Sequence, residues 1–176
     1  MTLMRKAGAI AVALSVGIVA MMAVGCAKKA VATPEAAFLE FQKAMVFNRR
    51  QALEKYATKE YIQGLESLFD LIVISANWPS NCVIAETKSV GDKAVIKATG
   101  QDRPSGERAL GVFKLEKTGG FWMVTAGEWI RKNEFMPSID EAANAQFTYY
   151  VNEISGILPQ QPNYSPMLLE ESYEGK

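Results

Sequence analysis

The chain of 176 residues contains no histidine and only two cysteines. The absence of histidine excludes Ser–His and Cys–His nucleophile pairs, a histidine general base and histidine metal ligands. Two cysteines cannot build a structural zinc site, which takes four ligands, so neither a metal nor a cofactor is expected. Basic and acidic residues number 19 each. This zero net charge argues against nucleic-acid binding, which uses a basic patch or stripe.

Charged side chains are also scarce in the first 25 residues, where Arg5 and Lys6 are followed by an uncharged apolar run from Ala7 to Val24. This layout is typical of a secretory signal. The run ends in Ala23-Val24-Gly25-Cys26, which resembles the lipobox of bacterial lipoproteins. The resemblance implies cleavage after Gly25 and acylation of Cys26, detectable as palmitate. Ala27 follows the cysteine in place of Asp, which in a Gram-negative cell implies the periplasmic face of the outer membrane.

Two alternatives to a lipid-anchored cell-envelope protein remain open. Ala23 stands where a branched residue is commoner, and Ala23-Val24-Gly25 also suits an ordinary signal peptidase, which would release a soluble secreted protein. The apolar run of about 18 residues is also marginally long enough to stay as a transmembrane anchor.

The organisation predicted from the sequence is a signal peptide (1–25), a lipidated tether (26–33), one domain (34–156) and a flexible tail (157–176). The tail is rich in proline and acidic residues, a composition that does not favour a packed core. Cys82 would be the one unmodified thiol after lipidation. It opens the apolar run Cys82-Val83-Ile84-Ala85, so we interpret it as a small buried hydrophobe.

Helices are predicted in the first part of the domain. Thr33-Pro34-Glu35 is a good helix start, and Phe38, Phe41 and Met45 follow at helical spacing. Asn48 is expected to cap a second helix, which contains Leu53 and Tyr56. Thr58 is expected to cap a third helix, whose apolar side runs from Ile62 to Ile72.

Strands are predicted next, over 82–89, 93–99, 108–117 and 121–129, joined by short turns. Such short connections imply an antiparallel meander. A capping box at Ser138-Ile139-Asp140-Glu141 then starts a last helix, for which Gly156 is a plausible stop. This helix is expected to pack on the sheet or to close the open end of a cone; binding a partner is the alternative. The predicted fold class is α+β: N-terminal helices packed on a curved antiparallel sheet, plus a C-terminal helix.

This order resembles the nuclear transport factor 2-like (NTF2-like) superfamily, which includes ketosteroid isomerase and the SnoaL-type cyclases. The resemblance rests on Thr33-Pro34-Glu35, on the second helix with its Thr-Lys-Glu-Tyr junction and on the closing Gly119-Gly120-Phe121-Trp122 hairpin, and it covers roughly residues 33–130. It implies a cone-shaped domain with a pocket between the sheet and the first helix, and it makes a homodimer possible.

No aspartate matches the catalytic positions of ketosteroid isomerase, which uses an Asp base. Each of the four aspartates (Asp70, Asp92, Asp102 and Asp140) is explained by a helix end or a turn. The candidate catalytic residue is Glu128, because it alternates with Trp122, Val124 and Ala126 and a carboxyl at an apolar pocket has a raised pKa. The alternative interpretation, which the sequence favours, is a strand-end residue that reaches water or pairs with Arg108 or Arg131.

Four aromatic residues are candidates to line a ligand pocket, although core packing explains most of them equally well: Tyr56, Tyr61, Trp78 and Trp122. The sequence therefore favours a non-enzymatic, lipid-anchored domain that binds a small apolar ligand or an envelope protein. The rival hypothesis is a small isomerase, dehydratase or hydrolase that uses Glu128. An open apolar cavity above about 300 Å³ with Glu128 inside would keep the rival in contention.

Overall fold

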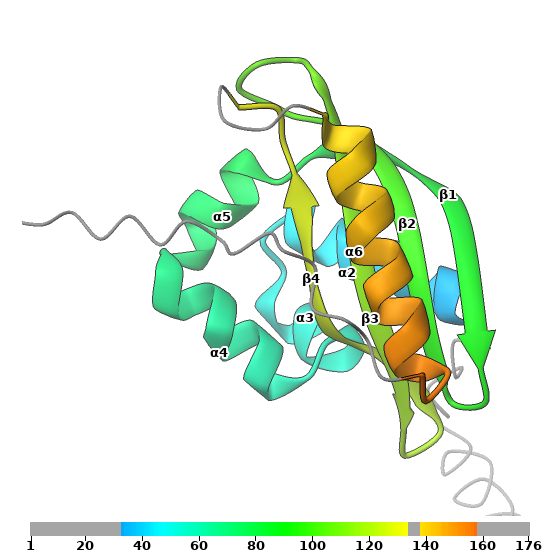
Figure 1. Cartoon of the computed structure of the whole chain (residues 1–176). Helices are drawn as coiled ribbons and strands as arrows, with labels where there is room; N and C mark the ends of the chain where they lie inside the picture. The colour runs from blue at the N-terminus through cyan, green and yellow to red at the C-terminus, as the bar shows by residue number, and fades with distance from the viewer. Residues whose placement is uncertain (1–32, 134–137, 158–176) are drawn as a thin grey trace, which may run out of the picture. The chain divides into compact units, whose positions relative to one another are not determined.

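The computed structural model describes residues 33–133 and 138–157 (Figure 1). The predicted signal peptide, Gly25, Cys26 and nearly all of the predicted tether and tail lie outside these residues. The described chain runs through helices α2–α5, strands β1–β4 and helix α6. This order confirms the predicted α+β class, with helices before a curved antiparallel sheet and one helix after it.

Helix α2 (Pro34–Val46) begins where the sequence predicts. The hydroxyl of Thr33 accepts a hydrogen bond from the backbone N–H of Ala36 at 3.3 Å, and Pro34 occupies the first turn. Phe38, Phe41 and Met45 are fully buried, as their helical spacing predicted. Helix α2 therefore presents one apolar stripe to the sheet.

Asn48 does not cap the second helix, α3 (Arg50–Tyr56). It has a φ of 49°, a left-handed turn conformation that asparagine tolerates, and the helix starts after Arg49 without a side-chain cap. Asn48 therefore supplies the left-handed backbone conformation of the tight turn after α2. The prediction that Asn48 caps the second helix was wrong, because Asn48 lies in this turn and Arg49 precedes the helix.

The third predicted helix is two helices, α4 (Lys59–Leu68) and α5 (Leu71–Asn77). Thr58 caps α4, as predicted, by accepting a hydrogen bond from the N–H of Tyr61 at 3.4 Å. The chain then becomes extended at Phe69, and the carboxylate of Asp70 accepts a hydrogen bond from the N–H of Ile72 at 2.8 Å. Asp70 thus starts a new helix instead of ending the old one.

The sheet has the order β1-β2-β3-β4, with every neighbouring pair antiparallel. Its strands are β1 (Ser80–Val90), β2 (Lys93–Gln101), β3 (Arg108–Thr118) and β4 (Phe121–Ile130). This is the predicted meander. Along β2, Ala94, Ile96 and Ala98 face the N-terminal helices, while Val95 faces the opposite layer.

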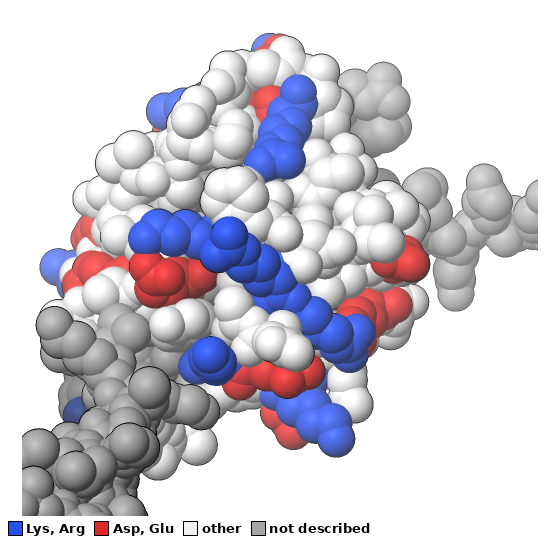
Figure 2. Space-filling view, turned by 180° about the vertical axis from the view of Figure 1, so that it is seen from behind, with Lys and Arg blue, Asp and Glu red and all other residues white. Residues whose placement is uncertain are grey.

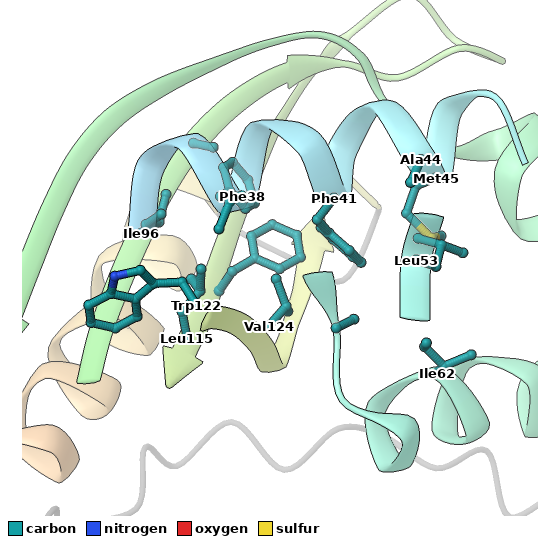
Figure 3. Close-up of a cluster of buried hydrophobic side chains, with 14 of the residues drawn as sticks. Phe38, Phe41, Ala44, Met45, Leu53, Ile62, Ile96, Leu115, Trp122 and Val124 are labelled. Carbon is teal, nitrogen blue, oxygen red and sulfur yellow. The ribbon is translucent and has the colours of Figure 1, made fainter. Parts of the chain in front are cut away.

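The inner core lies between α2, the short helices and the sheet (Figure 3). The rings of Phe38 and Phe41 from α2 pack against Phe113 of β3, with ring centroids 5.0 and 6.1 Å apart. Ile96, Leu115 and Val124 from the sheet are fully buried in the same cluster. Side chains therefore fill the space between α2 and the sheet.

Helix α6 (Ile139–Ile154) packs on the other face of the sheet (Figure 1). Ala143, Phe147 and Ile154 are buried against the outer cluster, which confirms packing on the sheet as one of the expected roles. Two sheet lysines strengthen this contact. The ammonium group of Lys97 lies 5.0 Å from the ring centroid of Phe147, and that of Lys114 lies 2.6 Å from a carboxylate oxygen of Glu153.

The surface carries charges of both signs. On the face seen from behind Figure 1, basic side chains lie next to acidic ones (Figure 2). Exposed pairs of this kind include Lys43 with Glu40 on α2, 2.6 Å apart. Among the helices of the described residues, none combines the length and the apolar character needed to cross a bilayer.

Candidate functional site

A cleft of about 450 Å³ opens between α4, α5 and the end of β4. It lies beside the filled core, whereas the resemblance implied a pocket between the sheet and α2. Apolar side chains form most of its wall: Leu65, Phe69, Val73, Ile74, Trp78 and Trp129. Polar side chains complete the lining: Asn77, Asp102, Glu128 and Arg131. This size and composition fit a small-molecule site, which typically occupies about 300–1,000 Å³.

The helical wall of the cleft results from the break between α4 and α5. Because the chain is extended at Phe69, the two helices do not share one continuous buried stripe. Phe69 and Val73 keep 66% and 47% of their surface exposed, although both are apolar. Exposed apolar side chains that meet at a concave site are typical of ligand or partner contacts.

The strand wall depends on a bulge in β4. Leu115 pairs with Val124, but the preceding residue, Lys114, pairs with Ala126, so β4 contains one extra residue at this point. Beyond it Trp129 packs with the inner core, whereas Glu128 lies opposite Val112, whose side chain belongs to the outer cluster. The simple alternation that placed Glu128 on the face of Trp122 and Val124 is therefore wrong beyond the bulge.

The indole of Trp129 occupies a space left by two glycines. A Cβ atom on Gly100 or Gly111 would lie 3.0 or 2.9 Å from carbon atoms of this indole. The ring also makes edge-to-face contacts with Trp78 and Phe113, at centroid distances of 6.5 and 5.7 Å. Glycines on neighbouring strands thus let Trp129 lie close to the sheet and form the inner wall of the cleft.

Trp78 is held from behind by a residue of α2. Its indole N–H donates a hydrogen bond to Oε1 of the buried Gln42 at 2.6 Å. The Nε2 atom of Gln42 and the Nε1 atom of Trp129 are buried and have no hydrogen-bond partner among the described residues. Trp78, a predicted ligand-pocket residue, lines the cleft, although 95% of its surface is buried.

The polar side of the cleft is dominated by an ion pair. Nε of Arg131 lies 2.7 Å from Oδ1 of Asp102, and another guanidinium nitrogen donates to the carbonyl oxygen of Asn77 at 2.7 Å. The other carboxylate oxygen of Asp102 accepts a hydrogen bond from the hydroxyl of Ser105 at 2.8 Å. These contacts join the β2–β3 loop, the end of α5 and the end of β4.

Glu128 makes no ion pair with any described residue. Arg108 pairs with Asp140 of α6 and Arg131 pairs with Asp102, so neither arginine is the partner that the alternative interpretation expected. Glu128 is exposed at the edge of the cleft, and partial desolvation by its neighbours raises the pKa of its carboxyl.

Two tyrosines interact electrostatically with Glu128, namely Tyr61 of α4 and Tyr150 of α6. Burial raises the pKa of both phenols, and the carboxylate raises each further. The hydroxyl of Tyr61 donates a hydrogen bond to the carbonyl oxygen of Gly127 at 2.8 Å. Tyr61, a predicted ligand residue, therefore supports the strand next to the cleft.

The other predicted residues lie in the core or outside the described chain. Trp122 is buried in the inner cluster, Tyr56 packs against that cluster, and neither lines the cleft. Cys82 packs against the inner cluster but is only partly buried, so its interpretation as a buried small hydrophobe holds only in part; desolvation raises the pKa of its thiol to about 12. Gly25 and Cys26 are not among the described residues.

The sequence reasoning did not select Phe69, Val73 or Trp129 as site residues. Phe69 falls within the apolar side predicted for one continuous helix, and neither Val73 nor Trp129 is among the predicted candidates. Asp70 in the middle of an apolar run was the available signal for the helix break, because aspartate favours N-caps over helix interiors. In the described part of the chain, Cys, Asp and Glu side chains form no group of three or more that could hold a metal ion.

No family model matches the sequence, and no curated protein matches it. Two solved structures are similar in fold, each at 18% identity and a TM-score of 0.45. One is a SEC-C motif containing protein from Rhodopseudomonas palustris, and the match covers 58% of this chain and 83% of that one. The other is an NTF2-like protein of unknown function from Shewanella baltica, with coverage of 57% and 92%.

Proposed function

We propose that this protein is a lipid-anchored cell-envelope protein whose domain binds a small apolar molecule. The observation that carries the proposal is the open cleft of about 450 Å³ beside the filled core. Phe69 and Val73 expose apolar surface to water at this cleft. Contact between apolar surface and water is unfavourable, and a bound apolar molecule would remove it.

The lipid anchor is supported by the sequence alone. A basic start, an uncharged apolar run and Ala23-Val24-Gly25-Cys26 are the features of a lipoprotein signal. Two or three acyl chains on Cys26 would give stable attachment, because one chain alone binds a membrane only marginally. Metabolic labelling with a palmitate analogue should mark the wild type and should not mark Cys26→Ser. Labelling of the variant would refute the anchor at this residue.

Ligand binding can be tested with a neutral apolar probe, 2-(2-naphthyl)ethanol. The full chain is placed in lipid nanodiscs, and binding is measured by equilibrium dialysis against empty discs. Val73→Lys replaces exposed apolar surface of the cleft with a hydrated ammonium group and should weaken binding about tenfold or more, since the neutral probe loses an apolar contact. The matched control is Val83→Lys, at an exposed valine of β1.

Binding that is unchanged by Val73→Lys would exclude the cleft as the site. Native mass spectrometry of the protein from its own cells provides an independent test. A small co-purifying molecule supports the proposal, whereas a stoichiometric envelope protein in its place would favour the partner-binding alternative.

Acid–base catalysis is the second candidate, and the raised pKa of Glu128 in the cleft is the observation that favours it. An isomerase, dehydratase or hydrolase also needs a group that stabilises the developing charge. Arg131 is engaged with Asp102, and the Tyr61 hydroxyl is engaged with a backbone carbonyl, so the geometry supports binding better. A turnover that Glu128→Gln abolishes without loss of binding would establish the enzyme instead.

A further inference from the structure

The charges that line the cleft do not cancel. Asp102 and Arg131 neutralise each other at 2.7 Å, and each has a further hydrogen bond to the protein. Glu128 lies exposed at the edge of the same cleft, on the α6 side of β4, and makes neither an ion pair nor a hydrogen bond with any described residue. The lining therefore keeps one carboxylate whose charge the protein does not compensate.

The surroundings of Glu128 strengthen its attraction for a cation. Its carboxyl is partly desolvated, and it interacts electrostatically with the phenols of Tyr61 and Tyr150, which are neutral at physiological pH. A charge pair interacts more strongly where water is partly excluded than on an open surface. The partly desolvated carboxylate thus gains from a cationic partner.

The aromatic wall favours the same kind of ligand. Phe69 and Trp129 line the cleft with part of their surface exposed, whereas Trp78 is almost fully buried, and aromatic rings attract cationic nitrogen. A fatty acid or another apolar anion would instead meet the uncompensated carboxylate and would be repelled. Of two ligands that share the same apolar group, the polar and aromatic parts of the lining therefore favour the cationic one over the anionic one.

We infer that the cleft selects molecules that join an apolar body to a cationic nitrogen, with Glu128 binding the nitrogen and Trp129 and Phe69 contacting the body. The inference rests on the proposed function of the cleft and adds the class of ligand to it. Glu128 is then a specificity-determining residue, since the apolar wall alone would accept neutral molecules equally well.

The test compares two soluble probes of nearly the same shape, 2-(2-naphthyl)ethylamine and 2-(2-naphthyl)ethanol. The full chain in nanodiscs of zwitterionic lipid is dialysed against each probe, and empty discs are subtracted. The amine should bind the wild type about tenfold more tightly than the alcohol does, near the lower end of what a charge-assisted hydrogen bond contributes. Glu128→Gln should remove this preference, and binding of both probes above empty discs shows that the variant is folded.

The matched control is Glu54→Gln, at an exposed glutamate of α3, and it should keep the preference for the amine. Amine affinity should also fall as the pH drops through the raised pKa of Glu128, in the wild type and not in Glu128→Gln. Equal binding of both probes would overturn the inference and leave the proposed function standing. Binding of neither probe above empty discs would overturn both.

Discussion

The substitution Gly127→Ala tests the close approach of β4 to β3 just beyond the bulge, in the strand wall of the cleft. Gly127 has a φ of 139°, which side chains rarely adopt. A Cβ atom would lie 2.5 Å from the carbonyl oxygen of Val112 and 2.7 Å from the Cα atom of Phe113. Both are backbone atoms of the paired strand β3, so neither can move aside as the end of a flexible side chain could.

The expected loss of stability follows from these two effects. A strained backbone conformation costs about 1–3 kcal/mol, and overpacking a core typically costs about 1–3 kcal/mol. We therefore expect the free energy of unfolding to fall by about 2–6 kcal/mol, a large part of the roughly 5–15 kcal/mol of a typical domain. At about 4 °C per kcal/mol, a loss of about 4 kcal/mol lowers Tm by about 16 °C.

Urea and thermal unfolding followed by tryptophan fluorescence and circular dichroism provide the assay. The matched control is Gly64→Ala on the exposed face of α4, where no heavy atom lies within 4 Å of the added Cβ. It should raise the free energy of unfolding by about 0.5–1 kcal/mol, because alanine is more favourable than glycine in the interior of a helix. A Gly127→Ala variant within about 1 kcal/mol of the wild type would refute the reasoning about this close approach.

Three further substitutions or treatments give expected outcomes. Trp78→Phe removes the donor to Oε1 of the buried Gln42 and should lower the free energy of unfolding by about 1–3 kcal/mol; equal urea midpoints would contradict the role of this bond. In the folded state the pKa of Glu128 is raised above its ordinary value of 4.5. As the pH falls through this raised pKa, the wild type should therefore gain stability relative to Glu128→Gln, with no further gain below the pKa of the unfolded chain. Parallel curves of Tm against pH between pH 8 and 4 would contradict this. Because the pKa of the Cys82 thiol is raised to about 12, Cys82 should react with iodoacetamide at pH 8 roughly a thousandfold more slowly in the native protein than in urea. Peptide mass mapping measures both rates. Similar rates would show that the native protein has an accessible thiolate.

Local features of the sequence determined most of the elements. Thr33 and Pro34 set the start of α2, Ser138 caps α6, and the alternation along β2 assigned its two faces correctly. These features depend on side chains and backbone groups a few residues apart, so periodicity and capping chemistry are sufficient to predict them. The fold class could be predicted because short turns between successive strands allow only antiparallel pairing of neighbours, which gives a meander.

The cleft was decided by contacts between distant residues. The extra residue in β4 became visible only through its pairing with β3, and it places Glu128 on the face opposite to the one that the alternation predicted. Likewise, Gly100 and Gly111 leave space for an indole that follows them by 29 and 18 positions in the chain. Sequence alternation assumes regular pairing, and one inserted residue reverses every face beyond it. The sequence by itself thus determined the order of the elements and named Glu128, whereas the tertiary structure decided where that carboxyl lies and that an apolar cleft opens beside it.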